Sequence, residues 1–174
     1  MKIKKKYGIC FCIIGLSGSG KSGIGKLIKK DIEKRYGKTI LIHGDEIRDI
    51  YNLKGYDKDY RLKLGKSNSN LCKLVTSQGI NIIFTTVGLI HKLQKYNRSN
   101  LENYLEIFIK SNIKTLIKKK KKKFYRKKTD FVWGIDLKPE FPRSPDITLH
   151  NDFKNSLNKM SLDLLKKINL KINL

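Results

Sequence analysis

The sequence predicts an α/β fold, a parallel five-stranded sheet flanked by helices. One reason is that short apolar segments alternate with segments whose apolar residues recur at helical spacing. Another is the glycine-rich run GLSGSGKS, residues 15–22, which stands between the first apolar segment and the first helical one. Parallel strands joined by helices bind their ligands beyond the carboxyl ends of the strands. Functional residues are therefore expected at those ends.

Five segments rich in apolar and β-branched residues predict the strands of the sheet. They are residues 7–15, 39–42, 80–87, 104–110 and 146–150. The first is apolar without alternation, which is typical of a parallel strand covered on both faces. We expect the second strand to lie beside the first in the sheet.

Helical patterns separate the predicted strands. Residues 22–37 and 61–78 predict two helices, each followed or ended by a glycine. A further helix passes through Leu116 into a lysine run, and the last begins near Phe153. The length of the chain is that of one domain, so we expect residues 1–174 to form a single unit.

The chain is strongly basic, with 39 Lys and Arg against 15 Asp and Glu and a formal charge of +24. Such an excess attracts polyanions, among them nucleotides, nucleic acids and anionic membranes. The basic residues run through the whole sequence, however, which favours a general compositional bias over a patch made for one partner. The charge alone therefore indicates only an affinity for anions.

Three features bear on the location of the protein. Cys10, Cys12 and Cys72 form neither a disulfide framework nor a zinc-ligand cluster, so we expect free thiols in a reducing cytoplasm. The N-terminus imitates a secretory signal, but cleavage there would destroy the glycine-rich run, and we reject that interpretation. No apolar run reaches the roughly 18 residues typical of a membrane span. We expect a cytoplasmic protein that enters no membrane.

The glycine-rich run fits the pattern G-x-x-x-x-G-K-S of a phosphate-binding loop, or P-loop, and predicts a P-loop NTPase. Glycines let backbone N–H groups point at phosphates, and the following helix adds positive potential. Lys21 neutralises phosphate charge, and the Ser22 hydroxyl is the predicted Mg²⁺ ligand, so the expected cofactors are ATP and Mg²⁺. The predicted ATP-binding residues are Gly15, Leu16, Ser17, Gly18, Ser19, Gly20, Lys21 and Ser22.

Asp45 follows the second predicted strand, and Arg48 lies one helical turn later. A carboxylate in that place can face the terminal phosphate and accept a proton from an acceptor hydroxyl. We therefore predict Asp45 and Lys21 as catalytic residues. The alternative is that Asp45 only caps the helix that follows it. Arg48 either binds an anionic acceptor or is an exposed helix charge.

Seven motifs together resemble the adenylylsulfate kinase family. They are GLSGSGKS, HGDEIR, GYDKDYR, SQGINIIFTT, YNR, YLEIFIK and WGIDLKPEFPRSPD, in the family's order and spacing. The resemblance implies a nucleoside-kinase-like fold with a mobile lid at about residues 118–145. It also implies transfer of the γ-phosphoryl group of ATP to the ribose 3′-hydroxyl of adenosine 5′-phosphosulfate. That reaction makes PAPS and serves sulfate assimilation.

The resemblance further implies roles on the acceptor side. Asp45 takes the place of the base that activates the acceptor hydroxyl. Arg48 and Arg61 resemble the family's binders of the phosphosulfate. Tyr56 stands where an aromatic residue stacks on the acceptor base, and Val87 where an apolar residue covers its other side.

The sequence departs from the family pattern mainly on this acceptor side. His43 replaces an Asp that helps to hold Mg²⁺, and a neutral histidine is a poor ligand for that ion. Leu64 replaces an acceptor-binding Asn, Ser67 replaces an Arg, and residues 87–90 replace an Ile-Ser-Pro-Tyr turn. This pattern favours, as the alternative, a kinase of another nucleotide-linked acceptor. Cytidine diphosphoramidate kinase, in surface-polysaccharide synthesis, is similar in this respect.

The lysine run that starts at Lys118 raises a third interpretation, a non-catalytic binder of nucleotides or nucleic acid. We favour a solvated helix end and lid, since no basic surface interleaved with aromatic residues accompanies the run. The expected partner is a small nucleotide acceptor, with no nucleic acid and no membrane. A homodimer is compatible with the sequence.

Overall fold

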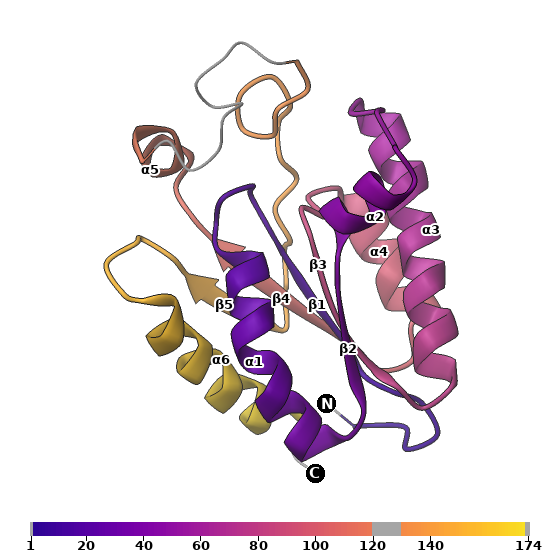
Figure 1. Cartoon of the computed structure of the whole chain (residues 1–174). Helices are drawn as coiled ribbons and strands as arrows, with labels where there is room; N and C mark the ends of the chain where they lie inside the picture. The colour runs from indigo at the N-terminus through magenta and orange to yellow at the C-terminus, as the bar shows by residue number, and fades with distance from the viewer. Residues whose placement is uncertain (1, 120–129, 173–174) are drawn as a thin grey trace.

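At the centre of the molecule lies a parallel five-stranded sheet in the order β2-β3-β1-β4-β5 (Figure 1). This computed structural model describes residues 2–119 and 130–172. The strands are β1 (Cys10–Gly15), β2 (Thr39–His43), β3 (Asn81–Thr86), β4 (Tyr104–Lys110) and β5 (Ile147–His150). The helices are α1 (Lys21–Tyr36), α2 (Gly44–Ile50), α3 (Lys58–Ser77), α4 (His91–Asn100), α5 (Ile113–Lys118) and α6 (Leu157–Ile172). The predicted α/β class with a parallel five-stranded sheet is confirmed.

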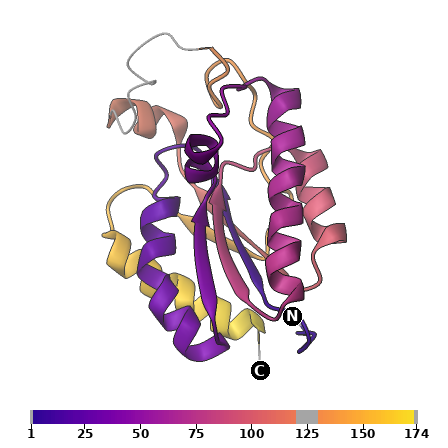
Figure 2. The same cartoon turned by 45° about the vertical axis from the view of Figure 1, so that its right-hand side comes forward.

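Helices cover both faces of the sheet (Figures 1 and 2). α1 and α6 pack together on one face, and α3 and α4 on the other. Alternate side chains of β1 enter the two cores: Phe11 and Ile13 join the first, and Cys12 and Ile14 join the second. Burial on both faces explains why β1 is apolar without interruption. The three cysteines are buried free thiols, as predicted.

Two helices differ from the sequence prediction. α4 is absent from it, because the helix buries Gln94 and Asn97 beside Leu93, and buried amides leave no apolar spacing to detect. α6 begins at Leu157 rather than near Phe153. The φ angle of Phe153 is 65°, in the left-handed region, so this residue cannot lie in a right-handed helix. The bounds predicted for β4 are confirmed.

The prediction that the second strand lies beside the first in the sheet is wrong. β3 lies between β1 and β2, so β2 forms the edge of the sheet. The physical reason is burial: β3 is buried along nearly all its length, whereas β2 exposes Ile40. The axes of β1 and β2 are consequently roughly 10 Å apart, twice the usual spacing of strands. Their carboxyl ends still meet at one edge of the sheet, on either side of Thr86.

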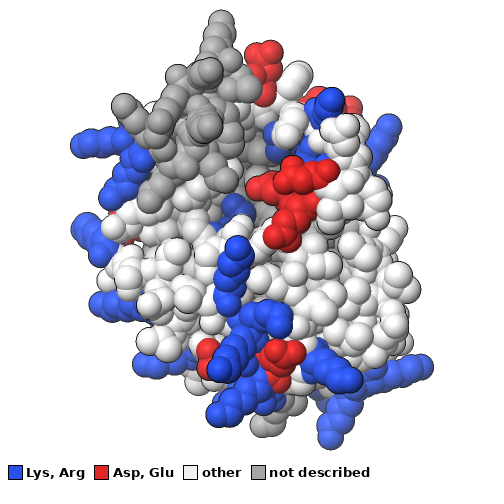
Figure 3. Space-filling view, in the orientation of Figure 1, with Lys and Arg blue, Asp and Glu red and all other residues white. Residues whose placement is uncertain are grey.

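The surface carries its basic side chains widely. Figure 3 shows Lys and Arg spread around the face drawn, without a single continuous patch. This distribution agrees with a compositional bias. Within the described ranges, no helix is both long enough and apolar enough to span a membrane.

Candidate active site

The P-loop connects β1 to α1, as its motif predicts. Gly18 and Gly20 have φ angles of 81° and 98°, a left-handed conformation that glycine adopts at little cost. Lys21 is the first residue of α1 and is 8% exposed, and its Nζ donates a hydrogen bond of 2.7 Å to the carbonyl of Leu16. The lysine therefore folds back over the loop, where it adds positive charge to the helix N-terminus.

Two long-range hydrogen bonds hold this loop in place. The side-chain Nδ2 of Asn151, just after β5, donates to the carbonyl of Ser19 at 2.9 Å. The backbone N–H of Gly15 donates to the carbonyl of Val87 at 3.1 Å, which links the loop to the segment after β3. The P-loop is thus fixed to the carboxyl ends of strands on both sides of β1.

Two cavities open at this edge of the sheet. The smaller, about 200 Å³, lies over the P-loop, and the larger, about 430 Å³, lies beside it. They share four lining residues, Ser17, Asp45, Thr86 and Val87. The predicted ATP-binding residues that line the smaller cavity are Ser17, Gly18, Gly20, Lys21 and Ser22. Of the remaining three, Leu16 and Ser19 are buried beneath the loop, and Gly15 ends β1.

Asp45 stands at the junction of the two cavities. It lies in the first turn of α2, is exposed, and forms no side-chain hydrogen bond with the described residues. The N-cap of α2 is His43, whose backbone N–H donates a hydrogen bond of 3.2 Å to the carboxylate of Glu46. The capping role considered for Asp45 therefore belongs to His43, and the carboxylate of Asp45 is free to act on a ligand.

His43 is buried at the edge of the smaller cavity. Its Nδ1 lies 2.7 Å from Oγ1 of Thr85, and its buried Nε2 has no hydrogen-bond partner among the described residues. The described part of the chain holds no cluster of three or more His, Cys, Asp or Glu that could bind a metal ion. The Ser22 hydroxyl and the nearby Asp45 carboxylate are oxygen donors, which Mg²⁺ prefers, and this ion commonly keeps several waters beside substrate phosphates. These residues therefore fit Mg²⁺ bound mainly through phosphates.

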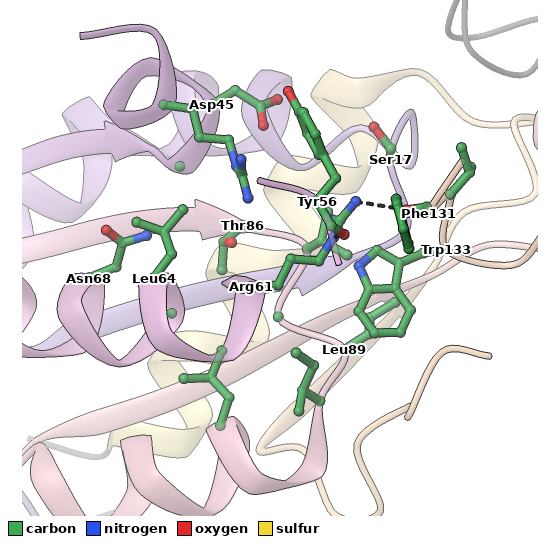
Figure 4. Close-up of a pocket in the computed structure, with 18 of the residues that line it drawn as sticks. Ser17, Asp45, Tyr56, Arg61, Leu64, Asn68, Thr86, Leu89, Phe131 and Trp133 are labelled. Atoms are coloured by element: carbon green, nitrogen blue, oxygen red, sulfur yellow. Dashed lines mark hydrogen bonds between the residues drawn. The ribbon is translucent and has the colours of Figure 1, made fainter. Parts of the chain in front are cut away.

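The larger cavity is assembled from segments far apart in the sequence (Figure 4). α2 supplies Asp45 and Arg48, and α3 supplies Arg61, Leu64 and further residues on one helix face. The wall opposite is the segment 87–90, held by hydrogen bonds from the Gln94 side chain to the carbonyls of Gly88 and Glu140. Residues 130–133 close the outer end of the cavity.

The two predicted acceptor arginines meet at Tyr56. The guanidinium carbons of Arg48 and Arg61 lie 4.6 and 5.4 Å from the centre of its ring. Arg48 donates to the carbonyls of Leu53 and Gly55, at 3.3 and 2.9 Å, and neither arginine forms an ion pair within the described residues. Burial and the neighbouring Arg48 lower the pKa of Arg61 to about 10. Two cations without a carboxylate partner make this end of the cavity attractive to an anion.

Trp133 and Phe131 are site residues that sequence reasoning did not assign. Trp133 is 5% exposed, and the guanidinium carbon of Arg61 lies 5.5 Å from the centre of its ring. Nη2 of Arg61 also donates a hydrogen bond of 2.8 Å to the carbonyl of Phe131. A signal was present, because Trp133 is the single tryptophan of the chain and begins the motif WGID. Of the predicted lid, residues 118–145, the part at 120–129 lies outside the described residues.

A phosphate-binding loop and a second cavity that meet at a carboxylate define a P-loop kinase. A family model described as adenylylsulphate kinase matches residues 7–150. The chain therefore belongs to the adenylylsulphate kinase family, whose members use ATP.

Two curated relatives and one solved structure illustrate the similarity. Cytidine diphosphoramidate kinase of Campylobacter jejuni is 31% identical, over 91% of this chain and 95% of its own length. Adenylyl-sulfate kinase of Buchnera aphidicola is 29% identical, over 92% and 84%. The structure of Mycobacterium tuberculosis APS kinase CysC in complex with AMPPNP and APS superposes with a TM-score of 0.83. It is 20% identical and covers 94% of this chain and 98% of its own, which supports the fold.

Proposed function

We propose that this kinase transfers the γ-phosphoryl group of ATP to a ribose hydroxyl of a nucleotide that carries an anionic 5′ substituent. The observation that carries the proposal is the position of Asp45, which lines both cavities. ATP in the smaller cavity and an acceptor in the larger one would meet at this carboxylate. Proximity of the two reactants is a large part of catalysis in such enzymes.

The chemistry follows from the residues at the junction. Asp45 accepts the proton of the acceptor hydroxyl, and the hydroxyl oxygen forms a bond to the γ-phosphorus. The bond from that phosphorus to the β–γ bridging oxygen breaks, and ADP leaves. Lys21 and the P-loop backbone stabilise the negative charge on the phosphate oxygens. Mg²⁺, held at the Ser22 hydroxyl, would add charge neutralisation to the phosphates.

Cytidine diphosphoramidate is the acceptor we favour. The relative named for it is more than 30% identical over nearly the whole chain. Leu64 lies on the wall of the acceptor cavity and offers no polar group there. Ser67, which replaces an arginine of the family pattern, is exposed and lies outside that lining. The positive charge of that arginine is therefore missing from the cavity.

Adenosine 5′-phosphosulfate is the second candidate, with sulfate assimilation as its pathway. Arg48, Tyr56 and Arg61 gather where the family resemblance places the binding of its base and phosphosulfate. Adenylyl-sulfate kinases are also among the relatives, at 25% and 29% identity.

An assay of ADP release tests the proposal. Mg-ATP is supplied with adenosine 5′-phosphosulfate, cytidine diphosphoramidate or cytidine 5′-diphosphate, and the products are identified by mass spectrometry. We expect turnover with cytidine diphosphoramidate and a product one phosphate heavier. If only adenosine 5′-phosphosulfate is turned over, the second candidate is supported. If none of the three acceptors is turned over, the proposal is contradicted.

The remaining expectations accompany this proposal. We propose a cytoplasmic location, because the reaction needs ATP and because the three buried cysteines are free thiols. The homodimer remains an expectation that size measurements in solution can test.

A further inference from the structure

Asn68 is a buried amide at the inner end of the acceptor cavity. It lies on α3, is 7% exposed, and lines the cavity beside Leu64 (Figure 4). Its side chain forms no hydrogen bond with the described residues. The amide is reached from the cavity and has no partner there among the described residues, so it is available to a ligand. No sequence motif points to this role, because a single asparagine within a helix forms no recognisable pattern.

The spacing on α3 relates Asn68 to the arginine end of the cavity. Arg61, Leu64, Gly65 and Asn68 fall on one face of the helix, at intervals of three, four and seven residues. Seven residues of α-helix span about 10 Å. A molecule that contacts Arg61 at the outer end and Asn68 at the inner end is therefore about as long as a nucleotide with an extended 5′ substituent.

The two ends of the cavity differ in chemistry. The outer end has the aromatic rings of Tyr56 and Trp133, whose flat faces suit a nucleotide base. The acceptor cavity borders a small cavity of the core, and the residues that line both are Gly65, Asn68, Thr86 and Leu93. None of these four carries a ring or a charge. With the base against these rings and the first phosphate beside Arg48 and Arg61, the terminal group of the 5′ substituent would extend toward the inner end.

The amide of Asn68 sets a chemical requirement on that terminal group. Its NH₂ donates hydrogen bonds and can bind an anionic oxygen, whereas its carbonyl oxygen needs a donor. A sulfate group at neutral pH has only acceptors and leaves the carbonyl unpaired. A phosphoramidate has both anionic oxygens and an N–H group, and satisfies both halves of the amide.

We propose that Asn68 determines acceptor specificity by binding the terminal group of the 5′ substituent and selecting one that carries both an N–H donor and anionic oxygens. The NH₂ group of Asn68 donates to a phosphoryl oxygen, and its carbonyl accepts from the phosphoramidate nitrogen. The inference rests on the proposed function, because it requires a nucleotide acceptor in this cavity.

A structural role is the competing explanation. Asn68 also borders a small cavity of about 20 Å³ in the core, which Asn97 lines with an Oδ1 that has no partner among the described residues. If Asn68 served only that region, its replacement would lower the melting temperature and leave the choice of acceptor unchanged. Selectivity between two acceptors separates the two roles.

The experiment compares two acceptors that differ in one group. Cytidine diphosphoramidate and cytidine 5′-diphosphate share base, ribose and diphosphate, and differ in NH₂ against oxygen at the terminal phosphorus. Initial rates give kcat/KM for each with the wild type, Asn68→Leu and the isosteric Asn68→Asp. Asn70→Leu is the control, since this exposed residue is on the same helix and outside both cavities. Melting temperature and the KM for ATP are measured for each variant.

We expect the wild type to prefer the phosphoramidate, and Asn68→Leu to lose roughly tenfold or more of that preference. Asn68→Asp keeps a hydrogen-bond acceptor but adds negative charge, so it should weaken the binding of both substrates. A wild type without preference, or an Asn68→Leu protein that keeps it, would overturn the inference while leaving the proposed function intact. Failure of every acceptor would instead refute the proposed function.

Discussion

The donor and acceptor halves of this site are built in different ways. The donor half is centred on one continuous loop, residues 15–22, and His43, Asp45 and residues 85–87 complete its lining. The acceptor half is assembled from α2, α3, the segment after β3 and residues 130–133. A continuous loop can be recognised as a sequence motif, but a cavity assembled from distant segments can be located only in the folded structure. We therefore expect phosphoryl transfer to depend mainly on the loop and the choice of acceptor to depend on the assembled wall.

The largest effect is expected in the donor half. Lys21→Ala should abolish turnover, with a loss beyond the roughly 10²–10³-fold that removal of one charge-stabilising donor costs elsewhere. In the proposed mechanism Lys21, which lines the smaller cavity, supplies positive charge to the transferring phosphate. Steady-state ADP release measures it, with Lys26→Ala, an exposed lysine on the same helix, as the control. Activity retained in Lys21→Ala would show that this loop does not carry catalysis.

A change at the junction should separate chemistry from binding. We expect Asp45→Asn to lower kcat by roughly 10²-fold or more, because a general base contributes about that much. The affinity for ATP, measured by titration calorimetry, should change little. Asp59→Asn, on α3 and outside both cavities, is the control. A variant with the kcat of the wild type would mean that Asp45 has no role in proton transfer.

The acceptor half should respond through KM. Arg61→Gln should raise the KM for the acceptor about tenfold and leave that for ATP unchanged, since a charge-assisted hydrogen bond is worth roughly 1.5–3 kcal/mol. Because burial and Arg48 lower the pKa of Arg61 to about 10, the guanidinium stays charged at neutral pH. Acceptor affinity should therefore be flat near neutrality and fall only as the pH rises toward 10. A parallel rise in the KM for ATP would contradict the division into two halves.

The smallest effect concerns His43, on the donor side. His43→Asp should lower the Mg²⁺ concentration needed for half-maximal activity by a few-fold, because a carboxylate is a better partner for hydrated Mg²⁺ than a neutral imidazole. Titration of activity with Mg²⁺ at saturating ATP measures the change. His43→Gln keeps a neutral polar side chain there and serves as the control. Identical Mg²⁺ curves for wild type and His43→Asp would mean that this position does not act on the ion.

The same contrast explains what could be predicted from the sequence. The P-loop and the five strands could be found, because glycine conformation and apolar runs act locally. The edge position of β2 could not, since it depends on β3 being the more deeply buried strand. α4 was missed because it buries amides, and Asn68 was missed because only the packing of α3 against the sheet turns it toward a cavity. Arg48 was suggested by its position one helical turn after Asp45, and Tyr56 and Arg61 by family resemblance. The contacts of the two arginines with Tyr56 required the fold.

The most direct test of the account follows the γ-phosphate through a single turnover. ATP labelled with ³²P at that position is mixed with excess enzyme and cytidine diphosphoramidate, and the products are separated by chromatography. We expect the label to move to the acceptor in the wild type, with one ADP formed for each transfer. Asp45→Asn should slow this transfer without preventing ATP binding. Label released only as inorganic phosphate, whichever nucleotide acceptor is supplied, would contradict it.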